Sequence, residues 1–263
     1  IKVLLSGAGG DEIFGGYPRH NSPKLGSPRW VAEKFPNSIS NMIGTIWEIF
    51  QPQRGIRAKS AAVAYGLECS GADISFLGQI MDSSINDVLE STSEPFVDLD
   101  KVDKDSNYTY QRMNLDINNY LIDDVLSLTD KATMAASVEG RVPLLDHRLV
   151  EFCFSLPKEI NHLGNKPKGL YIDLLKNKLP INLLNRSKEG FNAPTSNWLV
   201  DSVNSNVKNE ILDTFSPILE GIINKNRFEK ILMNNQNIRI AGNSLFGIYI
   251  LNRWLNEHCR NSK

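Results

Sequence analysis

A glycine-rich segment with two adjacent carboxylates lies close to the start of the chain, at residues 6–17. Its sequence is Ser-Gly-Ala-Gly-Gly-Asp-Glu-Ile-Phe-Gly-Gly-Tyr. Glycines let the backbone turn sharply and let a ligand such as a phosphate approach the backbone N–H groups. Asp11 and Glu12 would repel that phosphate unless a divalent cation lay between them, and Mg²⁺ binds through one or two carboxylates and phosphate oxygens. A plain strand-turn-helix connection, with both acids at the positive end of a helix, explains the same residues equally well.

A second charged segment lies in the middle of the chain. Glu139 follows a helix-like pattern, and Arg141 and Asp146 come shortly after it. On physical grounds, Arg141 and Asp146 predict an internal ion pair that fixes the loop. Asp130 and Lys131 lie on the polar side of the preceding helix, where they either line a cleft or face solvent.

A third segment, at 186–191, reads Arg-Ser-Lys-Glu-Gly-Phe. Gly190 permits a mobile loop there, and Ser187 can cap or orient the turn. Taken alone, the segment is typical of an exposed charged loop, in which Lys188 is one more solvated lysine.

In this order, the three segments resemble the asparagine synthetase family of the glutamine-dependent type, specifically the C-terminal part of its ATP-dependent synthetase domain. The stretch 130–148, Asp-Lys-Ala-Thr-Met-Ala-Ala-Ser-Val-Glu-Gly-Arg-Val-Pro-Leu-Leu-Asp-His-Arg, meets every fixed position of a family pattern. The segment 6–17 resembles the second nucleotide-site motif of the family. The segment 186–191, followed by Pro194 and Trp198, resembles its late lysine loop.

The resemblance implies an α/β fold of the adenine-nucleotide alpha-hydrolase type, a parallel sheet with flanking helices. Residues 1–263 would hold the closing strand and a mostly α-helical C-terminal portion. A glutaminase domain and a Ser-Gly-Gly-x-Asp-Ser pyrophosphate loop would lie upstream. An independent pattern agrees, because 2–5 predict a fully buried strand, and only 95–97 and 238–240 offer further extended pattern to pair with it. We therefore expect one part of a larger domain.

In this family, the carboxylate of aspartate attacks the α-phosphorus of ATP to give an acyl-adenylate and pyrophosphate, and ammonia from glutamine then displaces AMP. The resemblance implies that Asp11 binds Mg²⁺, that Lys188 neutralises charge around the phosphates, and that Glu139 orients or activates the amine. ATP and Mg²⁺ would both need the upstream loop, so residues 1–263 alone are expected to be inactive. The implied nucleotide-binding residues are Ser6, Gly7, Gly9 and Lys188.

One departure from the family pattern concerns the substrate. The residue after the Ser-Gly pair is glutamate in many asparagine synthetases, where it contributes to proton transfer, and here it is Ala8. Ala8 leaves the adenylating class intact but weakens the assignment of free aspartate. The alternatives are an amidotransferase for a cell-surface sugar acid or peptide, and a catalytically lapsed interaction module. The presence of Asp11, Glu139 and Lys188 argues against the lapsed module.

Helices are expected to position most of these residues. Residues 119–137 predict an amphipathic helix, 168–179 a helix that Pro180 stops, and 243–258 a third helix. Residues 91–108, which are acidic and rich in Ser and Thr, predict a surface loop. The expected core face of the first helix is Leu121, Val125, Leu128, Ala132 and Ala135. That of the third helix is Leu245, Ile248, Leu251 and Leu255.

The composition is that of a soluble globular protein, with 29 Lys and Arg against 30 Asp and Glu among 263 residues. The net charge of −1 gives no broad basic footprint for nucleic acid. No apolar run approaches the roughly 20 residues that span a bilayer, and we expect a cytoplasmic protein. The three cysteines predict buried free thiols. The sequence leaves open whether 242–244 and Trp254 pack internally or at a homodimer interface.

Overall fold

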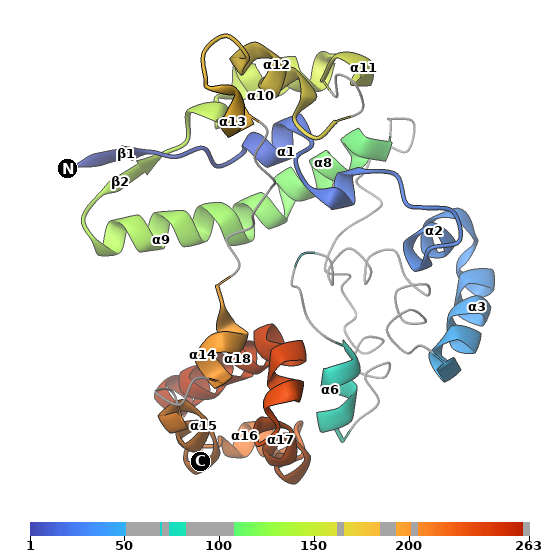
Figure 1. Cartoon of the computed structure of the whole chain (residues 1–263), viewed down its shortest axis with the longest axis vertical. Helices are drawn as coiled ribbons and strands as arrows, with labels where there is room; N and C mark the ends of the chain where they lie inside the picture. Colours follow the sequence, from blue (N-terminus) through green and yellow to red (C-terminus); the bar gives the residue numbers. More distant parts are fainter. Residues whose placement is uncertain are drawn as a thin grey trace. The chain divides into compact units, whose positions relative to one another are not determined.

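The protein is described by a computed structural model over residues 1–50, 69, 74–82, 108–161, 166–184, 193–200 and 205–259. The chain forms two compact units (Figure 1). Unit 1 comprises Ile1–Leu25 and Phe96–Lys188, and unit 2 comprises Gly26–Pro95 and Glu189–Lys263. The described residues are mostly helical with one small parallel sheet, which confirms a mixed α/β chain. Among them, no helix has the length and apolar character needed to cross a bilayer.

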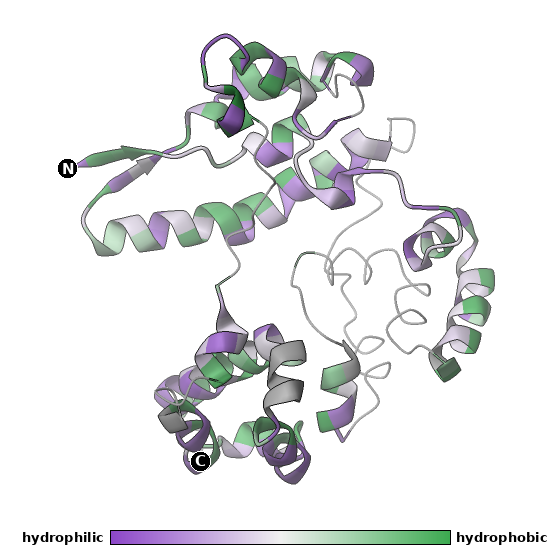
Figure 2. Ribbon diagram, viewed as in Figure 1, coloured by the Kyte–Doolittle hydropathy of each residue, from purple (hydrophilic) through white to green (hydrophobic). Residues whose placement is uncertain are grey.

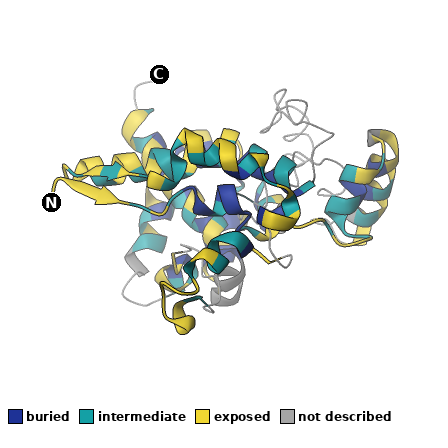
Figure 3. Ribbon diagram, turned by 90° about the horizontal axis from the view of Figure 1, so that it is seen from above, coloured by how far each residue is buried: buried dark blue, intermediate teal, exposed yellow. Residues whose placement is uncertain are grey.

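The sheet of unit 1 consists of β1 (Val3–Leu5) and β2 (Glu139–Arg141), which run parallel, with Val3 opposite Glu139 and Leu5 opposite Arg141. The opening strand is therefore confirmed. It is hydrophobic along its length (Figure 2), yet it is exposed (Figure 3), with Leu5 70% accessible. The expected full burial is not found, because β2 is the one partner of β1 within the described ranges and neither face of β1 is covered.

The core of unit 1 is small and surrounds the short helix α1 (Gly10–Phe14). Ile13 and Phe14 of α1 pack with Cys153, and partly buried residues from 144–154 and 170–171 surround them. The other elements of unit 1 are η1 (Pro18–His20), α8 (Tyr108–Asn118), the π-helical stretch η3 (Leu121–Leu126), α9 (Ser127–Ala135), η4 (Pro143–Leu145), α10 (His147–Ser155), α11 (Lys158–Asn161), α12 (Gly169–Leu175) and α13 (Ile181–Leu184).

The helix predicted at 119–137 is present. Of its predicted core face, Leu121 is buried and Val125 partly buried, but Leu128, Ala132 and Ala135 are exposed, so the prediction is wrong for α9. Figure 1 shows α8, η3 and α9 as one continuous rod, and none of the residues of α9 is buried. Leu128 is 64% exposed. A π-helical turn bonds i to i+5, so side chains spaced by three and four no longer share one face across it. The face of α9 that meets β2 carries Thr129 and Thr133 instead, whose side chains lie within 3.5 Å of the position of a Cβ at Gly140.

The predicted helix at 168–179 is confirmed over a shorter range. It ends as α12 at Leu175, before the turn that leads to Pro180. Lys168 precedes it in a left-handed conformation, with φ of 55°. The predicted surface loop at 91–108 and the extended pattern at 95–97 lie outside the described residues, apart from Tyr108, which begins α8.

Unit 2 is helical over its described residues and is dominated by α18 (Asn235–His258). Leu245, Ile248 and Leu255 are buried in its core as predicted, whereas Leu251 is exposed. Residues 238–240 are part of this helix, so the extended structure suggested there is wrong. The other helices are α2 (Pro28–Lys34), α3 (Asn37–Phe50), α6 (Ile74–Ile80), α14 (Thr195–Val200), α15 (Ser205–Asp213), α16 (Pro217–Glu220) and α17 (Lys225–Leu232).

Within 242–244, Gly242 is buried in unit 2, whereas Asn243 is exposed. A Cβ added at Gly242 would overlap Ser196 of α14, and the hydroxyl of Thr195 donates a 2.7 Å hydrogen bond to Asn243 Oδ1. Trp254 is half exposed on the same helix. The three cysteines are free thiols as predicted, but the predicted burial is found only for Cys153, because Cys69 and Cys259 are partly exposed.

Candidate functional site

The candidate site begins where β1 ends. The backbone N–H of Ser6 donates to the carbonyl of Arg141 at 2.7 Å and so extends the parallel ladder by one residue. The chain then turns, and the Ala8 N–H donates to Ser6 Oγ at 3.2 Å. Around Gly7, no described atom lies within 4 Å of the position of a Cβ, so the backbone is open to a ligand there. The predicted glycine turn between strand and helix is thus confirmed.

Gly9 has a structural reason to be glycine. Its φ is 88°, a left-handed conformation in which other residues are strained, and a Cβ there would overlap the side chain of Leu145. The close approach of η4 to the turn therefore explains Gly9 without a ligand. Whether Ser6, Gly7 and Gly9 bind a nucleotide stays a prediction.

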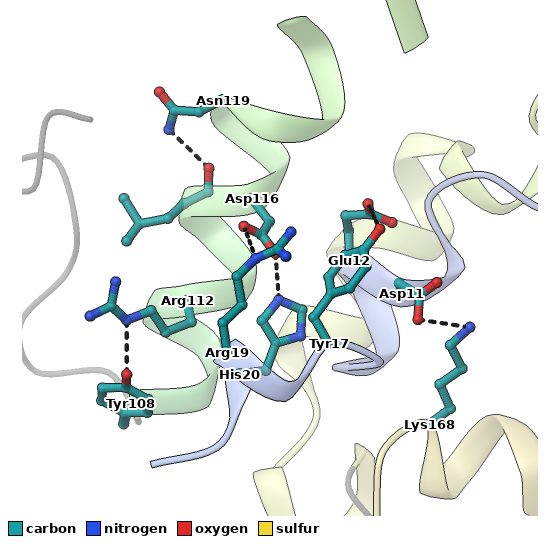
Figure 4. A network of polar contacts seen from close by, with 11 residues as sticks. Asp11, Glu12, Tyr17, Arg19, His20, Tyr108, Arg112, Asp116, Asn119 and Lys168 are labelled. Carbon is teal, nitrogen blue, oxygen red and sulfur yellow. Dashed lines mark hydrogen bonds and ion pairs between the residues drawn. The ribbon is translucent and has the colours of Figure 1, made fainter. Parts of the chain in front are cut away.

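Asp11 and Glu12 point in different directions. Asp11 lies in the first turn of α1, with its side chain partly exposed, and Lys168 Nζ is 2.9 Å from its Oδ1 (Figure 4). Glu12 is 1% exposed and accepts a 2.9 Å hydrogen bond from the hydroxyl of Tyr17. Burial raises the pKa of Glu12 above its ordinary value, and the hydrogen bond from Tyr17 opposes that shift. The two acids therefore do not form a shared carboxylate pair, and only Asp11 is available to a cation.

A carboxylate from α8 fixes the segment that follows α1. Asp116 is fully buried, with Arg19 Nε 2.9 Å and His20 Nε2 2.6 Å from its Oδ2 (Figure 4). Burial opposes its ionisation, but the hydrogen bond from His20 and the charge of Arg19 outweigh burial and hold the pKa of Asp116 below its ordinary value. The Arg19 guanidinium also lies 3.9 Å from the centre of the Tyr17 ring.

We call Glu12, Tyr17, Arg19, His20 and Asp116 the inner polar network. It ties α1 and η1 to α8, and it therefore sets the direction in which α1 presents Asp11. Sequence reasoning missed it, although Arg19 and His20 directly follow the glycine-rich segment. Asp116, the acidic partner of Arg19 and His20, is 97 residues further along the chain than Arg19, and no local sequence pattern predicts such a distant contact.

The predicted ion pair between Arg141 and Asp146 is wrong. Arg141 Nε lies 2.7 Å from Glu139 Oε1, because alternate residues of a strand share a face. Asp146 instead caps the N-terminus of α10, where its side chain accepts a hydrogen bond from the backbone N–H of Arg148 and lies 2.7 Å from the Arg148 guanidinium. The hydrogen bond from Arg141 lowers the pKa of Glu139, and the hydrogen bond from Arg148 lowers that of Asp146.

The structure brings together only some of the predicted site residues. Ser6, Gly7 and Asp11 lie around the turn at the carboxyl end of β1, whereas Glu139 begins β2 at the opposite end of the short ladder. Glu139 and both of the residues Asp130 and Lys131 are exposed. Lys188 lies outside the described residues. Lys168, which contacts Asp11, was predicted only as the first residue of a helix.

The donor set suits a magnesium ion shared with a substrate. Within the described ranges, no three His, Cys, Asp or Glu side chains gather as a metal site. A single accessible carboxylate matches the way in which Mg²⁺ is bound together with substrate phosphates, through one or two protein carboxylates. Asp11 fits that role.

Comparisons with known proteins show resemblance over most of the chain. The asparagine synthase family model matches residues 1–256. The chain is 29% identical over 225 residues to asparagine synthetase [glutamine-hydrolyzing] 1 of Bacillus subtilis, which covers 81% of this chain and 34% of that protein. It is 27% identical over 205 residues to a putative asparagine synthetase [glutamine-hydrolyzing] of Mycobacterium tuberculosis, covering 76% of this chain and 31% of that protein. The chain thus spans about a third of the length of these curated relatives.

Proposed function

Because the chain belongs to the asparagine synthase family, we propose that it forms part of a ligase that amidates a carboxylate at the expense of ATP. The carboxylate attacks the α-phosphorus of ATP, pyrophosphate leaves, and ammonia displaces AMP from the acyl-adenylate. Aspartate is the proposed acceptor, and ammonia released from glutamine is the proposed donor. The names of the relatives, asparagine synthetase [glutamine-hydrolyzing], support both assignments. We place this ligase in amino-acid biosynthesis in the cytoplasm.

The observation that carries the proposal is the turn at the carboxyl end of β1. It leaves the backbone at Gly7 open and presents Asp11 outward while Glu12 is buried. Ligands of parallel α/β sheets bind at the carboxyl ends of strands. An open backbone beside an accessible carboxylate suits a nucleotide that carries a divalent cation.

Each site residue has a distinct proposed task. Ser6 and Gly7 offer their backbone to the nucleotide, and Gly9 shapes the turn that presents them. Asp11 holds Mg²⁺, which supplies positive charge to the phosphates when it is bound. Lys188 stabilises the charge that develops around the α-phosphate and pyrophosphate. Glu139, kept ionised by Arg141, orients the amine.

The sheet supports a larger fold. A strand with three apolar, exposed residues and one described partner is an unfavourable arrangement in water. We propose that further strands of an adenine-nucleotide alpha-hydrolase-like sheet cover β1, and that the pyrophosphate loop and a glutaminase domain belong to the same protein. This chain spans 34% of the Bacillus subtilis relative, so a protein of that length has room for both the loop and the glutaminase domain.

The test is pyrophosphate release by the complete protein supplied with ATP, Mg²⁺ and aspartate. Asp11→Asn should lower the rate about 10²- to 10³-fold, which is typical for one electrostatic group aimed at a transition state. The matched control is Asp173→Asn, because Asp173 also pairs with a lysine, Lys176, on the exposed side of unit 1.

The control variant should keep the parent rate. Equal rates for Asp11→Asn and the parent would contradict the role of Asp11. Release of pyrophosphate with a sugar acid or a peptide, but not with aspartate, would show that aspartate is not the acceptor. Ala8, which departs from the family pattern, is the residue that makes this alternative worth testing. No release with any carboxylate would favour an interaction module.

A further inference from the structure

Asp11 already has a cationic partner within the protein. Lys168 Nζ lies 2.9 Å from Asp11 Oδ1, and the two side chains are 31% and 25% exposed. They come from distant segments, because Asp11 lies in α1 and Lys168 directly precedes α12 (Figure 4). Both groups remain accessible to a ligand from solvent.

Three backbone features build this contact. Lys168 is held in a left-handed conformation that lysine rarely adopts, and its backbone N–H donates to the carbonyl of Phe14 at 3.0 Å. Gly16 leaves the necessary room, because a Cβ there would overlap Asp11 Oδ1 and lie 2.5 Å from Lys168 Cε. Gly16 is also tied to Asp11, since its N–H donates to the Asp11 carbonyl at 2.7 Å. The backbone thus directs the ammonium group onto one oxygen of Asp11.

This arrangement changes what Asp11 can bind. A free divalent cation that approaches the carboxylate is repelled by the adjacent ammonium group. A divalent cation that carries a triphosphate has a net negative charge, and its phosphates are attracted by the same group. The carboxylate of Glu12 is buried and hydrogen-bonded to Tyr17, and it is not the carboxylate that pairs with Lys168.

We propose that Lys168 makes the Asp11 site selective for a divalent cation already bound to a nucleotide triphosphate over the free cation. This inference rests on the proposed function, because it requires that Asp11 bind the cation. One ammonium group beside a partly exposed cation changes each affinity by about tenfold. An ordinary surface ion pair would instead leave both affinities as they are when the lysine is removed.

The experiment measures two affinities in the complete protein at constant ionic strength. Free Mn²⁺ binding is followed by electron paramagnetic resonance, and binding of the Mn²⁺ complex of a non-hydrolysable ATP analogue by calorimetry. The test variant is Lys168→Asn, because asparagine tolerates the left-handed conformation. The control is Lys176→Asn, which removes an exposed lysine paired with Asp173 at the other end of α12. Thermal unfolding checks that each variant is folded, and Lys168→Gly replaces Lys168→Asn if the latter unfolds.

We expect Lys168→Asn to bind free Mn²⁺ about tenfold more tightly and the nucleotide complex about tenfold more weakly, while Lys176→Asn matches the parent. Two unchanged affinities, or two that move in the same direction, would overturn the selectivity. The variant Asp11→Asn distinguishes a failure of the proposed Lys168 selectivity from a failure of the proposed function. If Asp11→Asn weakens both affinities, the cation site stands and only the role of Lys168 is wrong. If it alters neither, both proposals fall.

Discussion

Replacing Asp116 by asparagine removes the negative charge that the inner polar network shares. Asp116 has no solvent exposure, and its two oxygens receive hydrogen bonds from Arg19 at 2.9 and 3.0 Å. His20 lies 2.6 Å from the same carboxylate. The variant keeps the size of the side chain but removes the carboxylate that pairs with the buried guanidinium of Arg19.

The expected loss follows from this geometry. Removing one partner of a buried ion pair costs about 3–5 kcal/mol, because the remaining charge stays desolvated. The rings of Tyr17 and Tyr120, 3.9 and 4.7 Å from the Arg19 guanidinium, contact it in the parent already, so they do not offset this loss. We therefore expect a destabilisation of at least about 3 kcal/mol. For a domain of this size, a loss of about 3 kcal/mol lowers the midpoint of thermal unfolding by roughly 6–12 °C.

The assay is thermal unfolding of the complete protein at pH 7, followed by circular dichroism, beside the exposed-pair control Asp173→Asn. The control should lose at most about 1 kcal/mol, as exposed pairs do. A second variant, Arg19→Met combined with Asp116→Asn, should be less destabilised than the sum of the single changes, because the guanidinium and the carboxylate that pair with each other are removed together. A midpoint for Asp116→Asn equal to that of the control would refute the reasoning.

Four further outcomes are expected. Glu12→Gln should raise stability at pH 8, because the raised pKa of Glu12 means that ionising it in the fold is unfavourable; the gain should shrink as pH falls towards 4.5, which parallel thermal melts would show. Gly9→Ala should lower stability by about 1–3 kcal/mol in denaturant titrations, through its positive φ and its overlap with Leu145; an unchanged midpoint would contradict the packing. Lys188→Ala should raise the activation free energy of pyrophosphate release by about 3 kcal/mol, and its circular dichroism spectrum should match that of the parent. Glu139→Gln should slow amide formation about 10²-fold or more while pyrophosphate release continues, and amide formation at the parent rate would remove Glu139 from the reaction.

Sequence patterns correctly predicted the features that depend on only a few neighbouring residues. The glycine turn after the first strand follows from the need for a positive φ at Gly9, and the core stripe of α18 follows from helical spacing. Both are decided within a few residues of chain.

The sequence did not predict the contacts between segments that are distant along the chain. Asp11 and Glu12 have the same chemistry and adjacent positions, and it is the hydrogen bond from Tyr17 to Glu12 and the approach of Lys168 to Asp11 that distinguish their surroundings. The face of α9 was mispredicted because a π-helical turn is invisible to a pattern that assumes regular spacing. Asp116 carried no signal, because an acidic residue in an amphipathic helix is usually solvated.

We propose that the complete protein adenylates the carboxylate of its substrate. The most direct measurement supplies aspartate labelled with ¹⁸O in its side-chain carboxylate, together with ATP, Mg²⁺ and glutamine, and follows the label by mass spectrometry. Attack on the α-phosphorus predicts one ¹⁸O atom in the phosphate of AMP for each amide formed, and loss of that product in Asp11→Asn. Label in inorganic phosphate, or AMP without label, would contradict the claim.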